Sequence, residues 1–354
     1  MKSILVTSTE EGTGKTAIAL ALAKLASERG LDVGYMKPKG TRLQSAVGKT
    51  RDEDPMLARE LLDIDDPMHE LEPVVYSPTF VDGALRGQED PDQLRDRIRT
   101  AFDGLAEGRD LMVIEGGGSM STGGIVDLTD ADVADLLDAE VLLVTRYEQP
   151  RDVDDVLAAA EQVGDRLAGV VFNAVADADV DAITTDVAPF LDGRGVPVLG
   201  VLPRVQEMAG VTVADLAESI GADVLTTGVD TDAFVERFTV GAMGSDSALR
   251  QFRRLRDAAM ITGGDRANVQ TAALEAPGIK CLVLTGGLQP PGAVLGRAES
   301  GDVPVLTVQT DTKTTIDRVE EVLRSGRTRT PESVAKMQSL LDDGVDLESL
   351  LDVE

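Results

Sequence analysis

The sequence predicts an α/β fold, in which a doubly wound parallel sheet is followed by a second, smaller α/β domain. Over roughly the first 200 residues, short apolar runs of strand length alternate with helical patterns. The same alternation restarts after residue 210. Aromatic residues make up only 3% of the chain, so the cores rest on Val, Leu, Ile and Ala, which suits buried parallel strands.

The first domain is expected over residues 1–205. Residues 4–6 form a short apolar strand, residues 17–26 follow a helical pattern that Gly30 closes, and residues 32–36 form a second strand. A strand, a crossover helix and a second strand imply a parallel sheet. The other expected elements of this domain are strands at 111–114, 141–144, 167–172 and 197–201 and a helix at 153–163.

The second domain is expected over residues 211–326, after a linker at 203–210. Thr212 is expected to cap a helix at 213–220. The other expected elements are strands at 238–240, 258–261, 281–284 and 305–308 and helices at 268–274, 291–298 and 314–323. The last segment, 327–354, is acidic, and its Leu-rich part is either a docking helix or a loose tail.

The chain is strongly acidic, with 34 Lys and Arg against 63 Asp and Glu, a net charge of −29. Such a surface repels nucleic acid, so we expect no nucleic-acid partner. The acid is spread along the chain, which favours a protein that works in high salt, where screening relieves self-repulsion. A merely acidic cytosolic protein is the alternative.

No membrane partner is expected. Met1 leads almost directly into a strand, without the apolar segment of a signal peptide. No uncharged run reaches the roughly 18 residues that span a bilayer. We therefore expect a cytoplasmic protein. Cys281, the single cysteine, lies in an apolar run and is expected to be buried in a strand.

A phosphate-binding loop is predicted at residues 11–16, between the first strand and the Ala-rich helix, which is the context of a P-loop. Its glycines would let main-chain N–H groups meet phosphate oxygens at the positive end of the helix. Lys15 would reach the β- and γ-phosphates, and Thr16 would bind Mg²⁺. The pattern G-x-x-x-x-G-K-[ST] is not fully met, because Thr9 stands at its first glycine, so a chance match is the alternative. The loop's expected nucleotide-binding residues are Gly12, Thr13, Gly14, Lys15 and Thr16.

Two other strings bear on this prediction. Glu115 ends a buried strand and is followed by three glycines, at the place where a second Mg²⁺ contact belongs. An ordinary glycine-rich turn is the alternative. Gly48-Lys49-Thr50 repeats the Gly-Lys-Thr string without a preceding strand, and we interpret it as loop.

These motifs resemble those of the dethiobiotin synthetase family of P-loop ATPases. Residues 8–16 are similar to that family's G-T-x-T-x-x-G-K-T loop, with Ser8 in place of the first glycine. Lys37-Pro38 matches its Lys-Pro after the second strand, and residues 115–119 are similar to its E-G-A-G-G. The resemblance covers roughly residues 1–205 and implies a P-loop NTPase-type domain that binds ATP and Mg²⁺.

The resemblance also implies roles for single residues. The family has a metal-binding Asp at the start of a helix, for which Asp54 is the best candidate and Asp52 and Glu53 compete. Its adenine-contacting Asn follows the fifth strand, where Asn173 lies. The implied catalytic residues are Lys15 and Lys37, and the implied metal ligands are Thr16, Asp54 and Glu115.

The second domain resembles a DRTGG domain in residues 260–268 and again in residues 284–287. This pair of domains is similar to the part N-terminal to the catalytic domain of long phosphate acetyltransferases, so we expect a free-standing regulatory half. A candidate second ligand site is an anion-accepting turn in which Arg266 pairs with a carboxylate or phosphate. A structural helix cap with a surface salt bridge is the alternative. The residues of this candidate site are Gly263, Gly264, Asp265 and Arg266.

Two functions follow from these resemblances. The first is a regulatory ATP- and Mg²⁺-binding protein of acetyl-CoA and acetate metabolism, with a phosphate acetyltransferase or another acyl-CoA enzyme as partner and a homo-oligomeric state. The second is an ATP-dependent ligase of the dethiobiotin synthetase type that acts on a small carboxylate. A degenerate scaffold is a third alternative, disfavoured by the intact Gly14-Lys15-Thr16 and Glu115.

Overall fold

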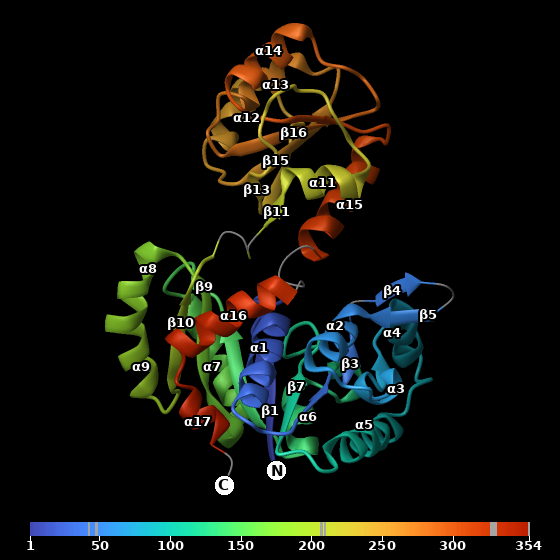
Figure 1. The fold of residues 1–354 in the computed structure, drawn as a ribbon, viewed down its shortest axis with the longest axis vertical. Helices are drawn as coiled ribbons and strands as arrows, with labels where there is room; N and C mark the ends of the chain where they lie inside the picture. The colour runs from blue at the N-terminus through green and yellow to red at the C-terminus, as the bar shows by residue number, and fades with distance from the viewer. Residues whose placement is uncertain (42, 47–48, 206–207, 209, 326–330, 353–354) are drawn as a thin grey trace. The chain divides into compact units, whose positions relative to one another are not determined.

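The structure, a computed structural model, describes residues 1–41, 43–46, 49–205, 208, 210–325 and 331–352. They form two compact units (Figure 1). The first unit comprises residues 1–204 together with 328–354, and the second comprises residues 205–327.

Six parallel strands form the main sheet of the first unit, in the order β10-β9-β8-β1-β7-β2. In its middle, Val6 of β1 pairs with Glu115 of β7, and Ser8 of β1 pairs with Val144 of β8. The carboxyl ends of these strands therefore meet at one edge. The predicted doubly wound parallel sheet is confirmed. Its strands are β1 (Lys2–Ser8), β2 (Val33–Met36), β7 (Leu111–Glu115), β8 (Glu140–Thr145), β9 (Leu167–Val175) and β10 (Val198–Pro203).

Helices cover this sheet with their apolar faces. Helix α1 is buried along most of its length, as its run of Ala and Leu allows. Helix α6 begins at a capping box in which the Thr129 and Asp132 side chains each accept from the other residue's main-chain N–H. The helices of this part include α1 (Lys15–Glu28), α2 (Glu53–Leu62), α3 (Met68–Leu71), α4 (Pro78–Leu85), α5 (Pro91–Ala106), α6 (Asp130–Leu137), α7 (Asp152–Val163), α8 (Asp177–Ala182) and α9 (Ala188–Asp192).

Short strands lie beside the main sheet. Strand β3 (Lys39–Gly40) pairs in parallel with β6 (Val74–Val75). Strand β4 (Leu43–Ala46) pairs antiparallel with β5 (Lys49–Asp52). The loop interpretation of the second Gly-Lys-Thr string is therefore wrong for Lys49 and Thr50, while Gly48 lies outside the described residues. Pairing with β4 satisfies main-chain groups that a loop would leave to water.

The segment after the second unit is helical and packs on the first unit. Helix α16 (Pro331–Gly344) lies against α1, and α17 (Leu347–Leu351) follows it (Figure 1). Between the two helices, the Asp346 N–H donates to the Leu199 carbonyl at 2.8 Å. Burial of each large apolar side chain stabilises this contact by about 1.5–3 kcal/mol. The buried apolar residues here are Val334, Met337, Leu341, Leu347, Leu350 and Leu351.

The second unit contains a five-stranded sheet in the order β12-β17-β16-β15-β14. Strands β14 to β17 run parallel, and β12 pairs antiparallel with β17. The four strands expected in this part are all present. The Thr212 hydroxyl accepts from Asp215 N–H at the start of α11, as predicted. The elements include β11 (Val211–Thr212), α11 (Val213–Ile220), β12 (Asp223–Val224), β13 (Phe234–Val235), β14 (Arg237–Val240), α12 (Ser245–Phe252), β15 (Ala258–Gly263), α13 (Ala267–Ala273), β16 (Ile279–Thr285), α14 (Gly292–Ser300), β17 (Val305–Thr307) and α15 (Thr312–Ser325).

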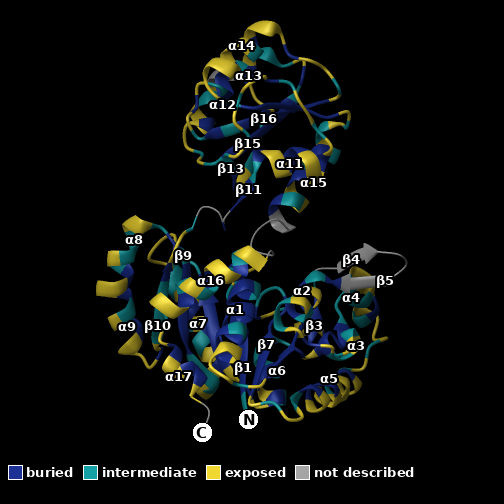
Figure 2. Cartoon of the chain, in the orientation of Figure 1, coloured by how far each residue is buried: buried dark blue, intermediate teal, exposed yellow. Residues whose placement is uncertain are grey.

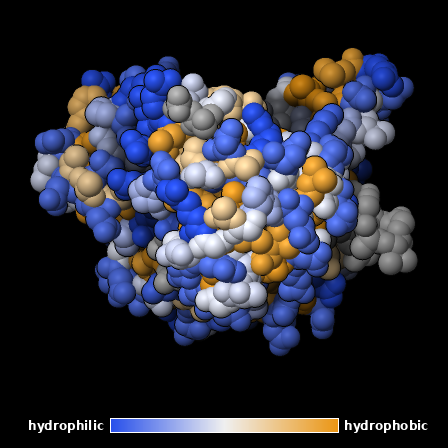
Figure 3. Space-filling model, turned by 90° about the horizontal axis from the view of Figure 1, so that it is seen from above, coloured by the Kyte–Doolittle hydropathy of each residue, from blue (hydrophilic) through white to orange (hydrophobic). Residues whose placement is uncertain are grey.

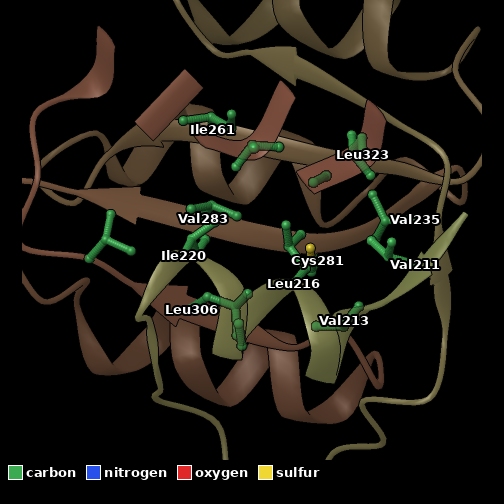
Figure 4. Packing of buried hydrophobic residues seen from close by; sticks show 14 residues of the cluster. Val211, Val213, Leu216, Ile220, Val235, Ile261, Cys281, Val283, Leu306 and Leu323 are labelled. Atoms are coloured by element: carbon green, nitrogen blue, oxygen red, sulfur yellow. The ribbon is translucent and has the colours of Figure 1, made fainter. Parts of the chain in front are cut away.

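The core on one face of this second sheet is built from aliphatic side chains (Figure 4). Ile261, Cys281, Val283 and Leu306 project from the parallel strands onto α11 and its neighbours. Cys281 is fully buried, as predicted, and burial raises the pKa of its thiol to about 12. It therefore behaves as a small apolar core residue.

Burial follows the strands, and polarity follows the outer surface. The strands of both units are largely buried, while the outward faces of many helices are exposed (Figure 2). The face seen in Figure 3 is mostly hydrophilic, with apolar patches between the hydrophilic residues. Among the described residues, no helix combines the length and apolar character that a membrane span requires.

Candidate functional site

The phosphate loop joins β1 to α1 at the carboxyl edge of the main sheet. Gly12 and Gly14 have φ angles of 74° and 92°, in the left-handed region that favours glycine. A Cβ atom on Gly14 would lie 2.5 Å from Nδ2 of Asn173, so only glycine fits there. Within the described part of the chain, no side chain caps the N-terminus of α1. Its first main-chain N–H groups are therefore suited to an anion.

Lys15, the first residue of α1, folds back over this loop. Its side chain is largely buried, and Nζ donates to Oγ of Ser8 at 2.7 Å and to the Gly118 carbonyl. The Ser8 hydroxyl in turn donates to the Glu10 carbonyl at 2.6 Å. Ser8, which stands where the resembling family has glycine, thus links the lysine to the loop backbone.

Thr16 and Glu115 meet beside Lys15. The Thr16 hydroxyl donates to Oε1 of Glu115, and the Tyr35 hydroxyl donates to Oε2, both at 2.6 Å. Burial and the Asp54 carboxylate raise the pKa of Glu115, and they outweigh Lys37 and the two hydroxyl donors, which lower it. Two of the three predicted metal ligands are therefore in direct contact.

Lys37 connects the third predicted metal ligand to this group. Its fully buried ammonium contacts Asp54, lies 2.8 Å from Oδ2 of Asp52 and 3.8 Å from Oε1 of Glu115. Burial lowers the pKa of Lys37, but the three carboxylates outweigh burial and raise it above its usual value. Of the competing acids, Asp52 also caps α2 by accepting from the Asp54 N–H, while Glu53 begins that helix.

A second buried ion pair supports the glycine-rich segment after β7, and it was not predicted. Lys39 Nζ lies 2.8 Å from Oδ1 of Asp130, and it donates to the Thr122 and Leu128 carbonyls. A Cβ atom on Gly116 would lie 2.1 Å from Oδ2 of Asp130. Packing therefore accounts for glycine at that position. The only sequence signal for this pair was the second lysine of Lys-Pro-Lys.

Two side chains from the ends of β8 and β9 donate hydrogen bonds to main-chain carbonyls of the phosphate loop. Nδ2 of Asn173 donates to the Thr13 carbonyl at 2.7 Å. Nη2 of Arg146, which was not predicted, donates to the Gly12 carbonyl. Asn173 lies within β9 rather than after it, because the strand continues to Val175.

The residues of this edge fit a nucleotide and a metal ion. The Thr13 hydroxyl is buried in the loop without a hydrogen-bond partner among the residues that the structure describes. In residues 1–41, 43–46, 49–205, 208, 210–325 and 331–352, no group of three or more His, Cys, Asp or Glu is arranged to hold a metal. Mg²⁺ in phosphate sites needs only one or two carboxylates, because a hydroxyl, water and phosphate complete its shell. Thr16, Asp54 and Glu115 supply such a set.

The candidate second site lies at the carboxyl end of β15. Gly263 ends that strand, and a Cβ atom on Gly264 would lie 1.9 Å from the Leu288 carbonyl. Arg266 donates to the main-chain carbonyls of Gly241, Ala242 and Met243. The expected pairing of Arg266 with a carboxylate or phosphate of a ligand stays a prediction. Within the protein, these bonds of Arg266 join the turn of Gly263 to Arg266 to the segment that follows β14.

Two family models match this chain. Residues 2–225 match the model of a family described as an AAA domain. The chain belongs to this AAA-domain family. Residues 215–322 match the model of the DRTGG domain. The predicted architecture, a dethiobiotin synthetase-like P-loop domain followed by a DRTGG domain, is confirmed.

The curated relatives of this chain include phosphate acetyltransferases, dethiobiotin synthetases and cobyric acid synthases. A phosphate acetyltransferase of Pseudomonas putida is 25% identical over 345 residues, which cover 92% of this chain and 48% of the relative. An ATP-dependent dethiobiotin synthetase of Methanococcus vannielii is 28% identical over 176 residues, which cover 49% of this chain and 80% of the relative. The chain thus spans about half the length of this phosphate acetyltransferase.

The solved structures that are similar to this chain have lower sequence identity to it than these two relatives have. The MinD cell division protein of Aquifex aeolicus is 16% identical with a TM-score of 0.37, covering 59% of this chain and 84% of that one. The CBS and DRTGG domains of a Clostridium perfringens pyrophosphatase, complexed with the activator diadenosine tetraphosphate, are 16% identical with a TM-score of 0.29. That match covers 43% of this chain and 80% of the other.

Proposed function

We propose that the first unit binds ATP together with Mg²⁺ at the carboxyl edge of its main sheet. One observation carries the proposal: Lys15, Thr16, Asp54 and Glu115 converge there with Lys37, although they come from four separate segments. The main-chain N–H groups of residues 12–16 would hold the phosphates, and Lys15 would neutralise their charge. Asn173 would lie beside the nucleotide, next to the loop.

Thr16, Asp54 and Glu115 would hold the Mg²⁺. The metal, when bound, supplies positive charge that offsets the phosphate oxygens. The chain must make room for it, because the Thr16 hydroxyl and the Lys37 ammonium occupy oxygens of Glu115 and Asp54. Lys37 would then be available to a second anion beside the terminal phosphate. Such an exchange of partners fits a site in which, without the metal, the carboxylates pair with groups of the protein itself.

Calorimetric titration with ATP and Mg²⁺ in molar salt tests this proposal. The wild type is expected to bind, and Lys15→Ala is expected to weaken binding by at least about tenfold, because a charge-assisted contact is lost. Lys24→Ala removes the same charge from a later turn of α1 and serves as the control. Absence of heat with the wild type, or equal binding by both variants, would contradict the proposal.

We propose a regulatory role for this nucleotide site. The pairing of a P-loop domain with a DRTGG domain, and similarity to the phosphate acetyltransferase of Pseudomonas putida over 92% of the chain, support a link to acetyl-CoA and acetate metabolism. A phosphate acetyltransferase or another acyl-CoA enzyme is the proposed partner, and we propose a homo-oligomer. Co-purification of an acyltransferase with the tagged protein from a high-salt lysate would support this role, and its absence would count against it.

A ligase of the dethiobiotin synthetase type is the second candidate function. Lys37 favours this function, since its ammonium lies beside Glu115 and could face a carboxylate or carbamate that attacks the terminal phosphate. In that case, diaminopelargonate and bicarbonate would drive release of ADP. Slow ADP release that does not change across a panel of small carboxylates would favour the regulatory role instead.

We also propose that the protein works in the cytoplasm at high salt. The net charge of −29 supports the second point, since concentrated salt would screen the repulsion between carboxylates. A melting temperature that rises steadily with KCl up to molar concentrations would agree with it. A melting temperature that is independent of salt would contradict it.

A further inference from the structure

Arg146 is the one cation that contacts the carbonyl side of the phosphate loop in the described part of the chain. It follows β8 directly, and its Nη2 donates to the Gly12 carbonyl. Its Nε is buried without a hydrogen-bond partner among the described residues, so the guanidinium is turned toward the protein and not only toward solvent. Burial of an N–H group without a hydrogen-bond partner costs free energy, so we expect that the contact of Arg146 with the Gly12 carbonyl has a role.

The chain on both sides of Arg146 is anchored. The Thr145 hydroxyl lies 3.2 Å from the hydroxyl of Thr9, at the start of the loop. Tyr147 packs edge-on against Phe172 of β9, with ring centroids 6.2 Å apart. These contacts fix the backbone from which the guanidinium extends, so its position relative to Gly12 is determined by the sheet.

Because the peptide unit is planar, the contact of Arg146 with the Gly12 carbonyl also fixes the direction of an N–H group in the phosphate loop. In a trans peptide, the carbonyl of one residue and the N–H of the next point in opposite directions. Arg146 holds the Gly12 carbonyl and thereby directs the N–H of Thr13. Asn173 holds the Thr13 carbonyl at 2.7 Å and thereby directs the N–H of Gly14. Two consecutive carbonyls are held in this way, so the N–H groups of Thr13 and Gly14 point away from Arg146 and Asn173.

We propose that Arg146 is a positioning residue for the phosphate loop, acting through the Gly12 carbonyl and together with Asn173. It holds the loop amides in their anion-binding orientation before any anion arrives. The inference rests on the proposed nucleotide site for its consequence in binding, but not for its effect on the loop itself. Arg146 contacts a main-chain carbonyl, which points opposite to the N–H group that would meet an anion, so its contribution would not depend on the number of phosphates.

The first test measures the loop without nucleotide. In Arg146→Met, the NMR order parameters of the amides of residues 12–14 are expected to fall from the range of a rigid backbone, about 0.85, to below about 0.6, since the hydrogen bond that fixes the Gly12 carbonyl is lost. Arg146→Gln keeps an N–H donor and is expected to restore part of this order, which a purely electrostatic role would not allow. Arg166→Met removes a half-buried arginine that pairs with Asp135 and Asp138, and it serves as the charge-matched control. Unchanged order parameters in Arg146→Met overturn the inference.

The second test measures binding of ATP and ADP by calorimetry. Arg146→Met is expected to weaken both by the same factor, about tenfold, and Arg166→Met to weaken neither. A loss confined to ATP would overturn the inference, because it would mean that Arg146 contacts the terminal phosphate. Unchanged affinities would overturn it too. If the wild type binds no nucleotide, the proposed function fails, and the order-parameter experiment still decides the role of Arg146.

Discussion

Lys37 and Asp52 form an ion pair inside the first unit: the ammonium lies 2.8 Å from Oδ2, and the two side chains are 2% and 0% exposed. Asp54 and Glu115 face the same ammonium, so one buried cation offsets three acids. An arrangement of this kind is costly to build and more costly to break, because a buried charge without a counter-charge is strongly disfavoured. The charges of Asp52, Asp54 and Glu115 are therefore balanced within the protein by Lys37.

The first prediction concerns this ammonium. Lys37→Met leaves three buried carboxylates without their cation, and we expect the free energy of unfolding to fall by about 3–5 kcal/mol. Urea denaturation in buffer of fixed salt measures it. Lys2→Met is the control, since Lys2 pairs with a half-exposed Glu140 and the loss should be at most about 1 kcal/mol. Equal losses in the two variants would contradict the buried pair.

The second prediction concerns pH and Glu72, which lies against Gly40 and accepts from the Asp52 N–H at 3.1 Å. Burial raises the pKa of Glu72 from 4.5 to about 7, more than the Asp52 N–H lowers it. The folded state thus keeps the proton to higher pH than the unfolded state. The part of the stability that depends on Glu72 is therefore greatest below pH 4.5 and is lost as the pH rises to about 7.

Replacement by an amide should remove this dependence. Glu72→Gln is expected to match the wild type near pH 4.5 and to melt at a higher temperature above pH 7, with the difference growing between those values. Thermal melts across that range measure it. Glu60→Gln, an exposed site on α2, should give a constant difference. A Glu72→Gln difference that does not change with pH would show that Glu72 keeps an ordinary pKa.

Local signals in the sequence were enough for the fold and for much of the candidate site. Strand β1, the loop and α1 are continuous in sequence, so their order alone predicted where Lys15 and Thr16 would lie. Asp54 and Asp52 could not be separated beforehand, because one helix start brings both to Lys37. The choice depends on which of them caps α2, which is a matter of side-chain geometry.

Long-range contacts explain what the sequence did not reveal. Lys39 and Asp130 are 91 positions apart, and Arg146 and Gly12 are 134 apart. Such pairs are brought together by parallel strands whose carboxyl ends share an edge, and nothing in either local sequence records the partner. Helix α12 was also missed, because a mostly polar segment buries only a few apolar residues such as Ala248 and Phe252.

The third prediction concerns the buried pair that supports the glycine-rich segment. Lys39→Met and Asp130→Asn should each lower the free energy of unfolding by about 3–5 kcal/mol, since each leaves one buried charge unpaired. The double variant should lose much less than the sum, because both charges are gone. Urea denaturation of the four proteins in the cycle gives the coupling energy. Additive losses would mean that Lys39 and Asp130 do not interact as the 2.8 Å distance implies.

The fourth prediction separates two reasons for glycine in the phosphate loop. Gly14 and Gly30 have nearly the same φ angle, 92° and 90°, so an alanine at either position carries a similar backbone strain of about 1 kcal/mol. A Cβ atom at Gly30 meets no described atom within 4 Å, whereas at Gly14 it would lie 2.5 Å from Nδ2 of Asn173. We therefore expect Gly14→Ala to cost more than Gly30→Ala, and to weaken ATP binding, which Gly30→Ala leaves unchanged.

The source of that extra cost can be tested directly. Removing the obstructing amide in Gly14→Ala/Asn173→Ala should recover part of the stability that Gly14→Ala loses, because the added methyl group then has space. It should not recover ATP binding, since the loop has lost the Asn173 contact to the Thr13 carbonyl that directs the Gly14 N–H. If the second substitution only adds to the destabilisation, Asn173 does not press on Gly14 in solution, and the close approach of β9 to the phosphate loop is wrong.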